Sequence, residues 1–459
     1  MSTPTDTLTS SLTPGAALPA PTFTAGVPAV DHHSHAGYIR PGQKVEGVDQ
    51  YELENAMGHV EGHVPHDEYQ AYMRLVEGGE TAEAGSAAKR LGIDALVADS
   101  LRFQSTTVHA AALAEGSTAL YGRLTREATV AASREARTQD PVGLYDRALL
   151  LSGTAAVLTD IPEIDAELWP HARYKPVARI DPYLFPFGHP EWTGRGTDTP
   201  RFRRIFSRVL DRQLELAGTT LPTTLAAYEE FVVSSLVRRR GAGFVGLKIA
   251  SAYVRTLHFQ RVDRADAESA WRRLAAGPDV DPAAHKALAD HLAFLVLEWA
   301  VLHDMPVQIH TGFGHTEPGL RISTANPLLL EELLGDPRLN TLRVVLIHGG
   351  FPYSSNLTAL AQMHGNVHLD FSWMPYLQHH TVQRVLEEWL ELLPANRVMY
   401  GTDTGSPELH LASTRRARTA LDAVLGNGVR EGLWTMRQAG WLAERVLHQN
   451  LCDVYGIEL

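Results

Sequence analysis

The chain has 459 residues, of which 44% are hydrophobic and 20% charged, and its formal net charge is -12. This balance is typical of a globular protein, and the lack of a dense Lys/Arg run argues against a nucleic-acid partner. No apolar run reaches the ~18 residues that a membrane span requires. Cys452 is the only cysteine, which excludes an intrachain disulfide and favours a reducing, cytoplasmic location.

Residues 1–27 are rich in Ser, Thr, Pro, Ala and Gly and lack the basic start and apolar core of a secretory signal, so they are predicted to form a disordered tail. Beyond them, short apolar runs that end in a polar residue or Gly alternate with longer helical patterns. Eight strands are expected, at Pro28–Asp31, Asp94–Ala98, Pro176–Ile180, Phe244–Ile249, Pro306–Ile309, Arg343–Ile347, Val367–Asp370 and Arg397–Gly401.

Helices are predicted between the later strands, at Pro282–His303, Pro327–Leu334 and His380–Leu393. Repeated strand–helix units imply parallel pairing, and eight of them close into an α/β fold of the (β/α)8 TIM-barrel type over residues 28–459. The long stretches between the early strands are interpreted as helical insertions at about 37–90, 101–170 and 181–241. A separate N-terminal helical domain is the alternative, which is disfavoured because His33 must share a site with residues beyond 300.

Several of the expected strands end in histidine. His33 and His35 lie two residues apart, and side chains at that spacing point to the same side of a strand. His310 and His348 close two later apolar runs. Neutral imidazoles suit a divalent metal, with Zn²⁺ the default and Mn²⁺ or Fe²⁺ open, as one ion or two. His348 either binds a second ion or stays free and polarises the substrate; buried structural histidines are the alternative for the whole set.

Two further polar residues lie on expected strands. Asp403 follows the last strand, which neighbours the first in a closed barrel, so it can touch the metal and accept a proton from water. A turn-capping Asp is the alternative. Lys248, inside an apolar strand, must pair, reach solvent or change its chemistry. It binds a substrate carboxylate, bridges two metal ions as a carbamate, or forms an inward salt bridge.

Four more residues are candidates for the substrate pocket. Arg179 on the third strand, with Tyr253 and Arg255 after the fourth, can hold an anionic group, because the guanidinium fork matches a carboxylate. Trp373, after the seventh strand, lines the pocket. A structural role is the alternative for each of them.

These residues, in this order, resemble the amidohydrolase superfamily, whose pattern matches His33, His35, Lys248, His310, His348 and Asp403. The segment from Arg445 to Gly456 resembles the closing helix of its amidohydrolase-related branch. More narrowly, Gly246–Tyr253 and Gln308–Gly314 look like the amidohydrolase domain fused to glutamine synthetase in nodulin-like proteins.

The resemblance implies a hydrolase in which metal-activated water cleaves a C–N (amide-type) bond of a small carboxylate-bearing substrate, such as a γ-glutamyl amide. Asp403 and His348 would be the catalytic residues. The alternatives are a metal-dependent non-oxidative decarboxylase of a small aromatic acid, a non-catalytic metal-stabilised binding module and a sugar-acid isomerase. A small molecule is the expected partner, no membrane or nucleic acid is expected, and a homo-oligomer stays open.

Overall fold

The computed structural model describes residues 23–36, 47–78, 80–161, 172–188, 198–277, 281–314 and 320–459. Its centre is one sheet of eight parallel strands that follow one another in chain order. The strands are β1 (Ala29–Ser34), β2 (Thr154–Thr159), β3 (Tyr174–Arg179), β4 (Gly246–Ile249), β5 (Val307–His310), β6 (Val344–Ile347), β7 (Val367–Asp370) and β8 (Val398–Met399). Backbone hydrogen bonds from His32 N to Tyr400 O (3.0 Å) and from Asp403 N to His33 O (2.7 Å) join the two ends of the sheet, so the predicted α/β TIM-like barrel is confirmed.

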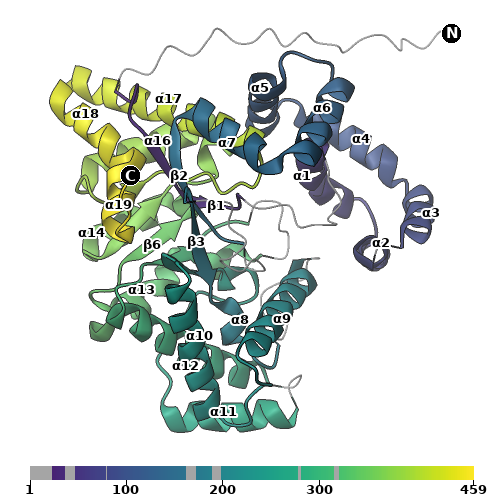
Figure 1. The fold of residues 1–459 in the computed structure, drawn as a ribbon, viewed down its shortest axis with the longest axis vertical. Coiled ribbons are helices and arrows are strands. Elements are labelled where there is room, and N and C mark those ends of the chain that lie inside the picture. The colour runs from purple at the N-terminus through teal and green to yellow at the C-terminus, as the bar shows by residue number, and fades with distance from the viewer. Residues whose placement is uncertain are drawn as a thin grey trace.

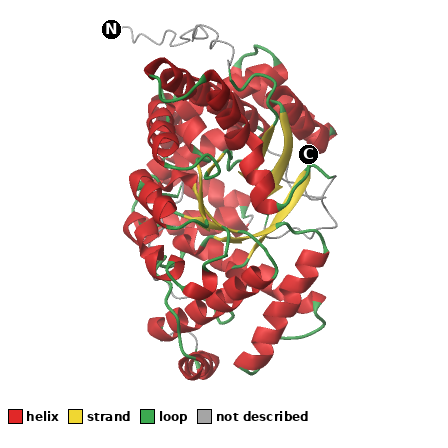
Figure 2. Cartoon of the chain, turned by 90° about the vertical axis from the view of Figure 1, so that its left-hand side faces the viewer, coloured by secondary structure: helices red, strands yellow, loops and turns green. Residues whose placement is uncertain are grey.

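Helices enclose the strands, which Figure 2 shows inside a helical shell. Before β2 lie α1 (Asp49–Glu61), α2 (His66–Gly78), α3 (Thr81–Leu91), α4 (Ile93–Gln104), α5 (Val108–Tyr121), α6 (Arg126–Gln139) and α7 (Pro141–Ser152). After β3 come α8 (Asp181–Leu184), α9 (Asp198–Leu216), α10 (Leu225–Gly241), α11 (Arg264–Ala276), α12 (Pro282–Leu302), α13 (Glu331–Leu334), α14 (Ser354–Met363), α15 (Met374–Leu377), α16 (His379–Leu392), α17 (Pro407–Glu431), α18 (Met436–Glu444) and α19 (Asn450–Tyr455). Short 3₁₀ helices are η2 (Ser251–Tyr253), η4 (Ile322–Ala325), η5 (Pro327–Leu330), η6 (Pro337–Leu339) and η7 (His348–Gly350), and a π-helical segment, η8 (Arg445–Gln449), joins α18 to α19.

Local sequence signals set several of these boundaries. Asp281 accepts hydrogen bonds from the first amides of α12, and Pro282 follows it at the first helical position. The same pairing of a capping side chain with proline opens α7 at Asp140 and α17 at Ser406. Gly153 ends α7 in the left-handed conformation (φ 68°) that glycine adopts readily, and β2 begins at the next residue.

Alternate strand residues face two different cores. Leu247, Ile309 and Leu346 belong to the large cluster that the surrounding helices share. Val30, Val177, Val345 and Met399 belong instead to a smaller cluster inside the barrel, together with Tyr455 of α19. Full burial of an aliphatic side chain stabilises the fold by about 1.5–3 kcal/mol, so both cores hold the strand ends in place. Because Lys248, His310 and Asp370 alternate with outward residues of the same strands, they face the barrel interior.

The helices before β2 lie to one side of the barrel (Figure 1). Of these, α5 and α7 pack against α17, whereas α1 packs on α4 and α2 on α3. The predicted tail of residues 1–27 lies outside the described residues as far as residue 22. Its last part is attached, because Phe23 N and Thr24 N both donate to Asp422 on α17. Of the described helices, none combines the length and hydropathy that a bilayer span needs.

The prediction of a strand at Asp94–Ala98 is wrong. These residues lie in α4, and the second strand is β2, inside the stretch 101–170 that was interpreted as helical. Ile93, Leu96 and Val97 belong to a cluster between α1, α2 and α4, and their spacing is that of a helical face rather than of a strand. Residues 37–46 and 79 of the first predicted insertion, 162–170 of the second and 189–197 of the third lie outside the described residues.

Candidate metal centre

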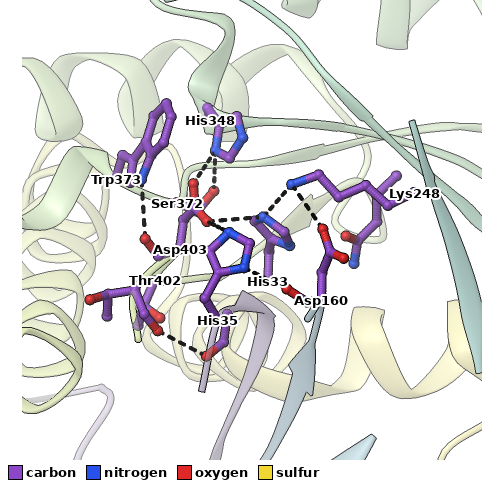
Figure 3. A network of polar contacts seen from close by, with 12 residues as sticks. His33, His35, Asp160, Lys248, His348, Ser372, Trp373, Thr402 and Asp403 are labelled. Carbon is purple, nitrogen blue, oxygen red and sulfur yellow. Dashed lines mark hydrogen bonds and ion pairs between the residues drawn. The ribbon is translucent and has the colours of Figure 1, made fainter. Parts of the chain in front are cut away.

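The carboxyl ends of β1 and β8 bring two imidazoles and a carboxylate together. His33 Nε2 lies 3.0 Å and His35 Nε2 2.9 Å from Asp403 Oδ1. Ligand atoms of these three residues all lie within 4.8 Å of one another, and Figure 3 shows both rings directed at the carboxylate. His33 is fully buried, whereas the His35 side chain is 37% exposed, so the cluster opens toward solvent at His35. Residues from opposite ends of the chain thus share one site.

The backbone around this cluster adopts conformations that non-glycine residues rarely take. Among the described residues, four non-glycine residues have a positive φ, and three of them are His348 (71°), Trp373 (67°) and Asp403 (54°). Such conformations cost roughly 1–3 kcal/mol each and persist where surrounding contacts hold them. Here Trp373 Nε1 and Tyr376 Oη donate to the carbonyl of Asp403 at 3.1 and 3.2 Å. The backbone strain is therefore concentrated in the residues whose side chains surround the candidate centre.

Two more histidines complete the group. His348 Nδ1 lies 3.3 Å from Asp403 Oδ2, and the ring of His310, from β5, is centred 4.5 Å from that of His348. All of these side chains except His35 are buried. Among the residues that the structure describes, His310 has no hydrogen-bond partner for either ring nitrogen, and His33 Nδ1 and His348 Nε2 also lack one. Buried polar atoms are normally paired, so the ring nitrogens of His310 and the Nε2 atom of His348 are open to a ligand from outside the chain.

The charge states of the group favour a cation. Burial lowers the pKa of His33 to about 4, and Lys248 adds to this effect. Burial also holds the pKa values of His310 and His348 well below the usual range. For Asp403 burial acts in the opposite direction, but the neighbouring His33 and His348 outweigh it and keep its pKa well below that of an ordinary carboxyl group. At neutral pH the site therefore offers the neutral imidazoles of His33, His310 and His348 and one carboxylate.

This donor set fits a divalent transition metal. Neutral imidazole nitrogens and a carboxylate oxygen are common ligands of Zn²⁺, and the unpaired buried nitrogens of His310 and His348 are atoms that such an ion would satisfy. His33, His35 and Asp403 meet the distance requirement for a shared ion, and His310 and His348 line the same space. The residues present are thus compatible with one ion or two.

Lys248 extends the group toward β2 and β3. Its Nζ lies 2.6 Å from His33 Nε2 and 3.7 Å from Asp160 Oδ2. Arg179, at the end of β3, donates from Nε to the same Asp160 oxygen at 3.0 Å. Burial lowers the pKa of Lys248 to about 8, although Asp160 and Asp403 oppose the shift. Asp160 is also buried, but Arg179 and Lys248 reverse that effect and lower its pKa to about 2. Lys248 thus forms an ion pair with Asp160 inside the barrel, and an inward salt bridge was one of its three predicted roles.

The other predicted substrate residues separate into two groups. Tyr253 in η2 lies beside the cluster, with its ring 4.5 Å from that of His310, and Trp373 stacks on His348 at 4.1 Å. Arg255 does not join them. It is fully buried and pairs with Asp290 on α12 at 2.6 Å, and its guanidinium lies over the ring of Phe259. The structure therefore places Arg255 in the loop after η2, where it is paired with α12.

Two residues around the site were not anticipated. Asp160 follows the apolar residues of β2, the same arrangement that marked His310 and His348, and its carbonyl accepts a hydrogen bond from His35 Nδ1 at 2.6 Å. Ser372, two residues beyond β7, contacts His348 Nδ1 through Oγ at 3.0 Å. If β2 had been recognised, the pattern of polar residues at strand ends could have found Asp160. No local signal indicated that Ser372 contacts His348.

Known proteins resemble part of this chain in sequence. The family model of the amidohydrolases matches residues 201–431, which include Lys248, His310, His348 and Asp403. Protein fluG of Emericella nidulans is 31% identical over 153 residues, which are 33% of this chain and 17% of fluG. The chain thus matches far less than two thirds of that relative.

Solved structures resemble the chain over nearly its whole length. A candidate metal-dependent hydrolase of Lactobacillus casei ATCC 334 has a TM-score of 0.66 at 20% identity, with 95% of this chain and 96% of that chain covered. The uronate isomerase of Bacillus halodurans C-125 has a TM-score of 0.63 at 13% identity and covers 95% of each chain. The glucuronate isomerase of Caulobacter crescentus has a TM-score of 0.62 at 16% identity, with 95% and 93% covered. At these identities the likeness concerns the fold.

Proposed function

The chain belongs to the amidohydrolase family, and from that premise we propose that it is a metal-dependent hydrolase of a C–N (amide-type) bond. The proposed substrate is small and carries a carboxylate. The observation that carries the proposal is the set of neutral histidines with unpaired nitrogens around the ionised Asp403. His33, His35, His310, His348 and Asp403 would hold the metal, which when bound supplies Lewis acidity toward a carbonyl group and makes water more acidic.

The protein residues have separate roles in this proposal. Asp403 is ionised and lies between His33, His35 and His348, so it can take a proton from the attacking water and pass it to the leaving amine. Trp373 covers one face of His348 and excludes water from that side. Lys248 presents a buried ammonium group within the site, where a substrate carboxylate would find a partner. Arg179 holds Asp160 in place beside it.

The choice of an amide rests on the sequence resemblance to synthetase-fused amidohydrolase domains, which favours a γ-glutamyl amide. A direct test incubates the purified protein, with and without added Zn²⁺, Mn²⁺ or Fe²⁺, with a panel of γ-glutamyl amides and related amides. Ammonia or amine release that requires the metal supports the proposal. Release of carbon dioxide from aromatic acids, or conversion of uronates, without amide cleavage would replace it with one of the alternative reactions.

Metal analysis tests the site without knowledge of the substrate. Protein purified without added metal is expected to carry about one or two equivalents of a divalent ion, and His33→Ala near none. His59→Ala is a control, because His59 lies in α1, its ring contacts that of His63, and it is not part of the cluster. Equal metal content in the wild type and His33→Ala would remove His33 from the centre. Bound metal without any turnover across the panel would favour a binding module.

A further inference from the structure

The position of the proton on the His348 ring follows from its surroundings. His348 Nδ1 faces two oxygen atoms, Ser372 Oγ at 3.0 Å and Asp403 Oδ2 at 3.3 Å. Figure 3 shows both contacts on the same edge of the ring. A carboxylate oxygen only accepts hydrogen bonds, so the identity of the donor depends on where Ser372 directs its single hydroxyl proton.

The hydroxyl proton of Ser372 is directed at Asp370. Asp370 Oδ1 is in short contact with Ser372 Oγ and also accepts from the amides of Ser372 (2.9 Å) and His348 (3.2 Å). Asp370 Oδ2 contacts His32 Nδ1 at 3.1 Å. An ionised carboxylate can only accept hydrogen bonds, so the Ser372 hydroxyl and the His32 ring must both donate to Asp370. Since the Ser372 proton is used on Asp370, the hydroxyl oxygen can only accept from His348, and Nδ1 of His348 must carry the hydrogen.

A neutral imidazole with its proton on Nδ1 has a lone pair on Nε2. That Nε2 atom is buried and has no partner among the residues that the structure describes. We propose that Asp370 and Ser372 are positioning residues that lock His348 in its Nδ1–H tautomer and so present Nε2 as a lone pair. In this form His348 can bind a metal ion or accept a proton, but it cannot donate a hydrogen bond to an oxyanion.

The same hydrogen-bond chain extends to the far end of the barrel. His32 Nε2 contacts the hydroxyl of Tyr455 at 2.8 Å, and Gln308 donates to the His32 carbonyl at 3.0 Å. A consistent direction of donation runs from Tyr455 through His32 to Asp370. Gly401 leaves room for the carboxylate, because a Cβ there would lie 2.3 Å from Asp370 Oδ2. His35 is oriented separately, by the Asp160 carbonyl, so the Asp370–Ser372 pair is specific to His348.

The inference concerns the same site as the proposed function, but its first test needs neither metal nor substrate. Metal-free protein labelled with ¹⁵N-histidine is compared by NMR as wild type, Ser372→Ala and Ser372→Thr, with the His348 signals identified by their loss in His348→Asn. The wild type is expected to show a protonated Nδ1 and an unprotonated Nε2. Ser372→Ala should give a mixture of tautomers, and Ser372→Thr, which keeps the hydroxyl, should restore the single form.

The second measurement is Zn²⁺ affinity by competition with a chelator. Loss of an outer hydrogen bond to a ligating histidine typically costs about 10–100-fold in affinity, and we expect this for Ser372→Ala and for Asp370→Asn, which keeps the side-chain shape. Ser372→Thr should stay within about threefold of the wild type. Ser152→Ala is the control. Ser152 is also buried and hydrogen-bonded, but it lies before the amino end of β2, whereas the site lies at the carboxyl ends of the strands.

The outcomes separate the two proposals. A wild-type His348 protonated on Nε2 overturns the inference, as does a Ser372→Ala protein whose tautomer or Zn²⁺ affinity equals that of the wild type. If the wild type binds no divalent metal, the proposed function fails, while the NMR comparison still decides the tautomer. Should Ser372→Ala fail to fold, Asp370→Asn takes its place as the variant that disturbs His348, and Ser372→Thr remains the variant that is expected to match the wild type.

Discussion

Two sets of buried histidines inside the barrel differ in how their ring nitrogens are used. His32 has a partner for each nitrogen, Asp370 for Nδ1 and the Tyr455 hydroxyl for Nε2. Toward the carboxyl ends of the strands, His310 has none for either nitrogen among the described residues, and His33 and His348 each leave one unpaired. Both sets are buried. Burial alone therefore does not separate His32 from the histidines of the candidate site; the pairing of their ring nitrogens does.

The largest expected effect on turnover comes from Asp403, the carboxylate beside the histidines with unpaired nitrogens. Asp403→Asn keeps the side-chain shape and tolerates the positive φ, but it cannot accept a proton. We expect turnover on the amide found in the panel to fall by about 10³-fold or more, with the fold retained. Asp304→Asn is a matched control, because Asp304 has the same φ of 54° and lies at an exposed turn. Unchanged turnover in Asp403→Asn would remove it from its proposed role.

Matched substitutions in the two sets should have opposite consequences. His32→Leu leaves Asp370 and Tyr455 without their partner, so we expect the free energy of unfolding to fall by about 2–4 kcal/mol. His310→Leu removes two unpaired polar atoms, and the metal-free protein should be at least as stable as the wild type. Urea unfolding after metal removal measures both effects, and Zn²⁺ titration should show the larger affinity loss in His310→Leu, which removes a metal-binding ring itself. A comparable loss of stability in His310→Leu would mean that its nitrogens are paired in solution.

The sequence predicted most of the second half of the barrel because each strand there is an apolar run that ends in a polar residue. His310, His348 and Asp403 were placed correctly at strand ends by this pattern. The prediction that they approach one another depended on barrel closure, which the backbone bonds between β1 and the residues after β8 provide. Periodicity and strand order were sufficient there.

The first half of the barrel was harder, since tertiary context decides its elements. Leu96 and Val97 formed a short apolar run that is equally compatible with a strand or with a helical face. The run of β2 was overlooked because it follows directly on α7, within a stretch that was interpreted as helical, and Asp160 was overlooked with it. Arg255 was assigned to substrate because no local feature indicates Asp290 as its partner. Partners far apart in the chain are not readable from spacing.

A histidine outside both sets isolates the effect of burial on stability. Burial lowers the pKa of His109, in α5, to about 4. Between pH 6.5 and 4 the unfolded chain therefore binds a proton that the folded protein does not, so stability should fall as the pH is lowered through this window. We expect this contribution to be about 1–3 kcal/mol. Metal-free His109→Gln should lose that part of the pH dependence in urea unfolding, and identical profiles for the two proteins would contradict the assignment.

The smallest expected effect comes from Tyr455, the member of this hydrogen-bond chain that is farthest from His348. Tyr455→Phe removes one hydroxyl and leaves His32 Nε2 without that donor, so we expect a loss of about 1 kcal/mol in the free energy of unfolding. The contact between His32 and Asp370 stays, and with it the orientation of Ser372 and His348. Zn²⁺ affinity should therefore change by less than about threefold, since only the last step of the chain touches the metal-binding ring. A fall as large as that of Ser372→Ala would show that the paired and unpaired sets respond as one unit.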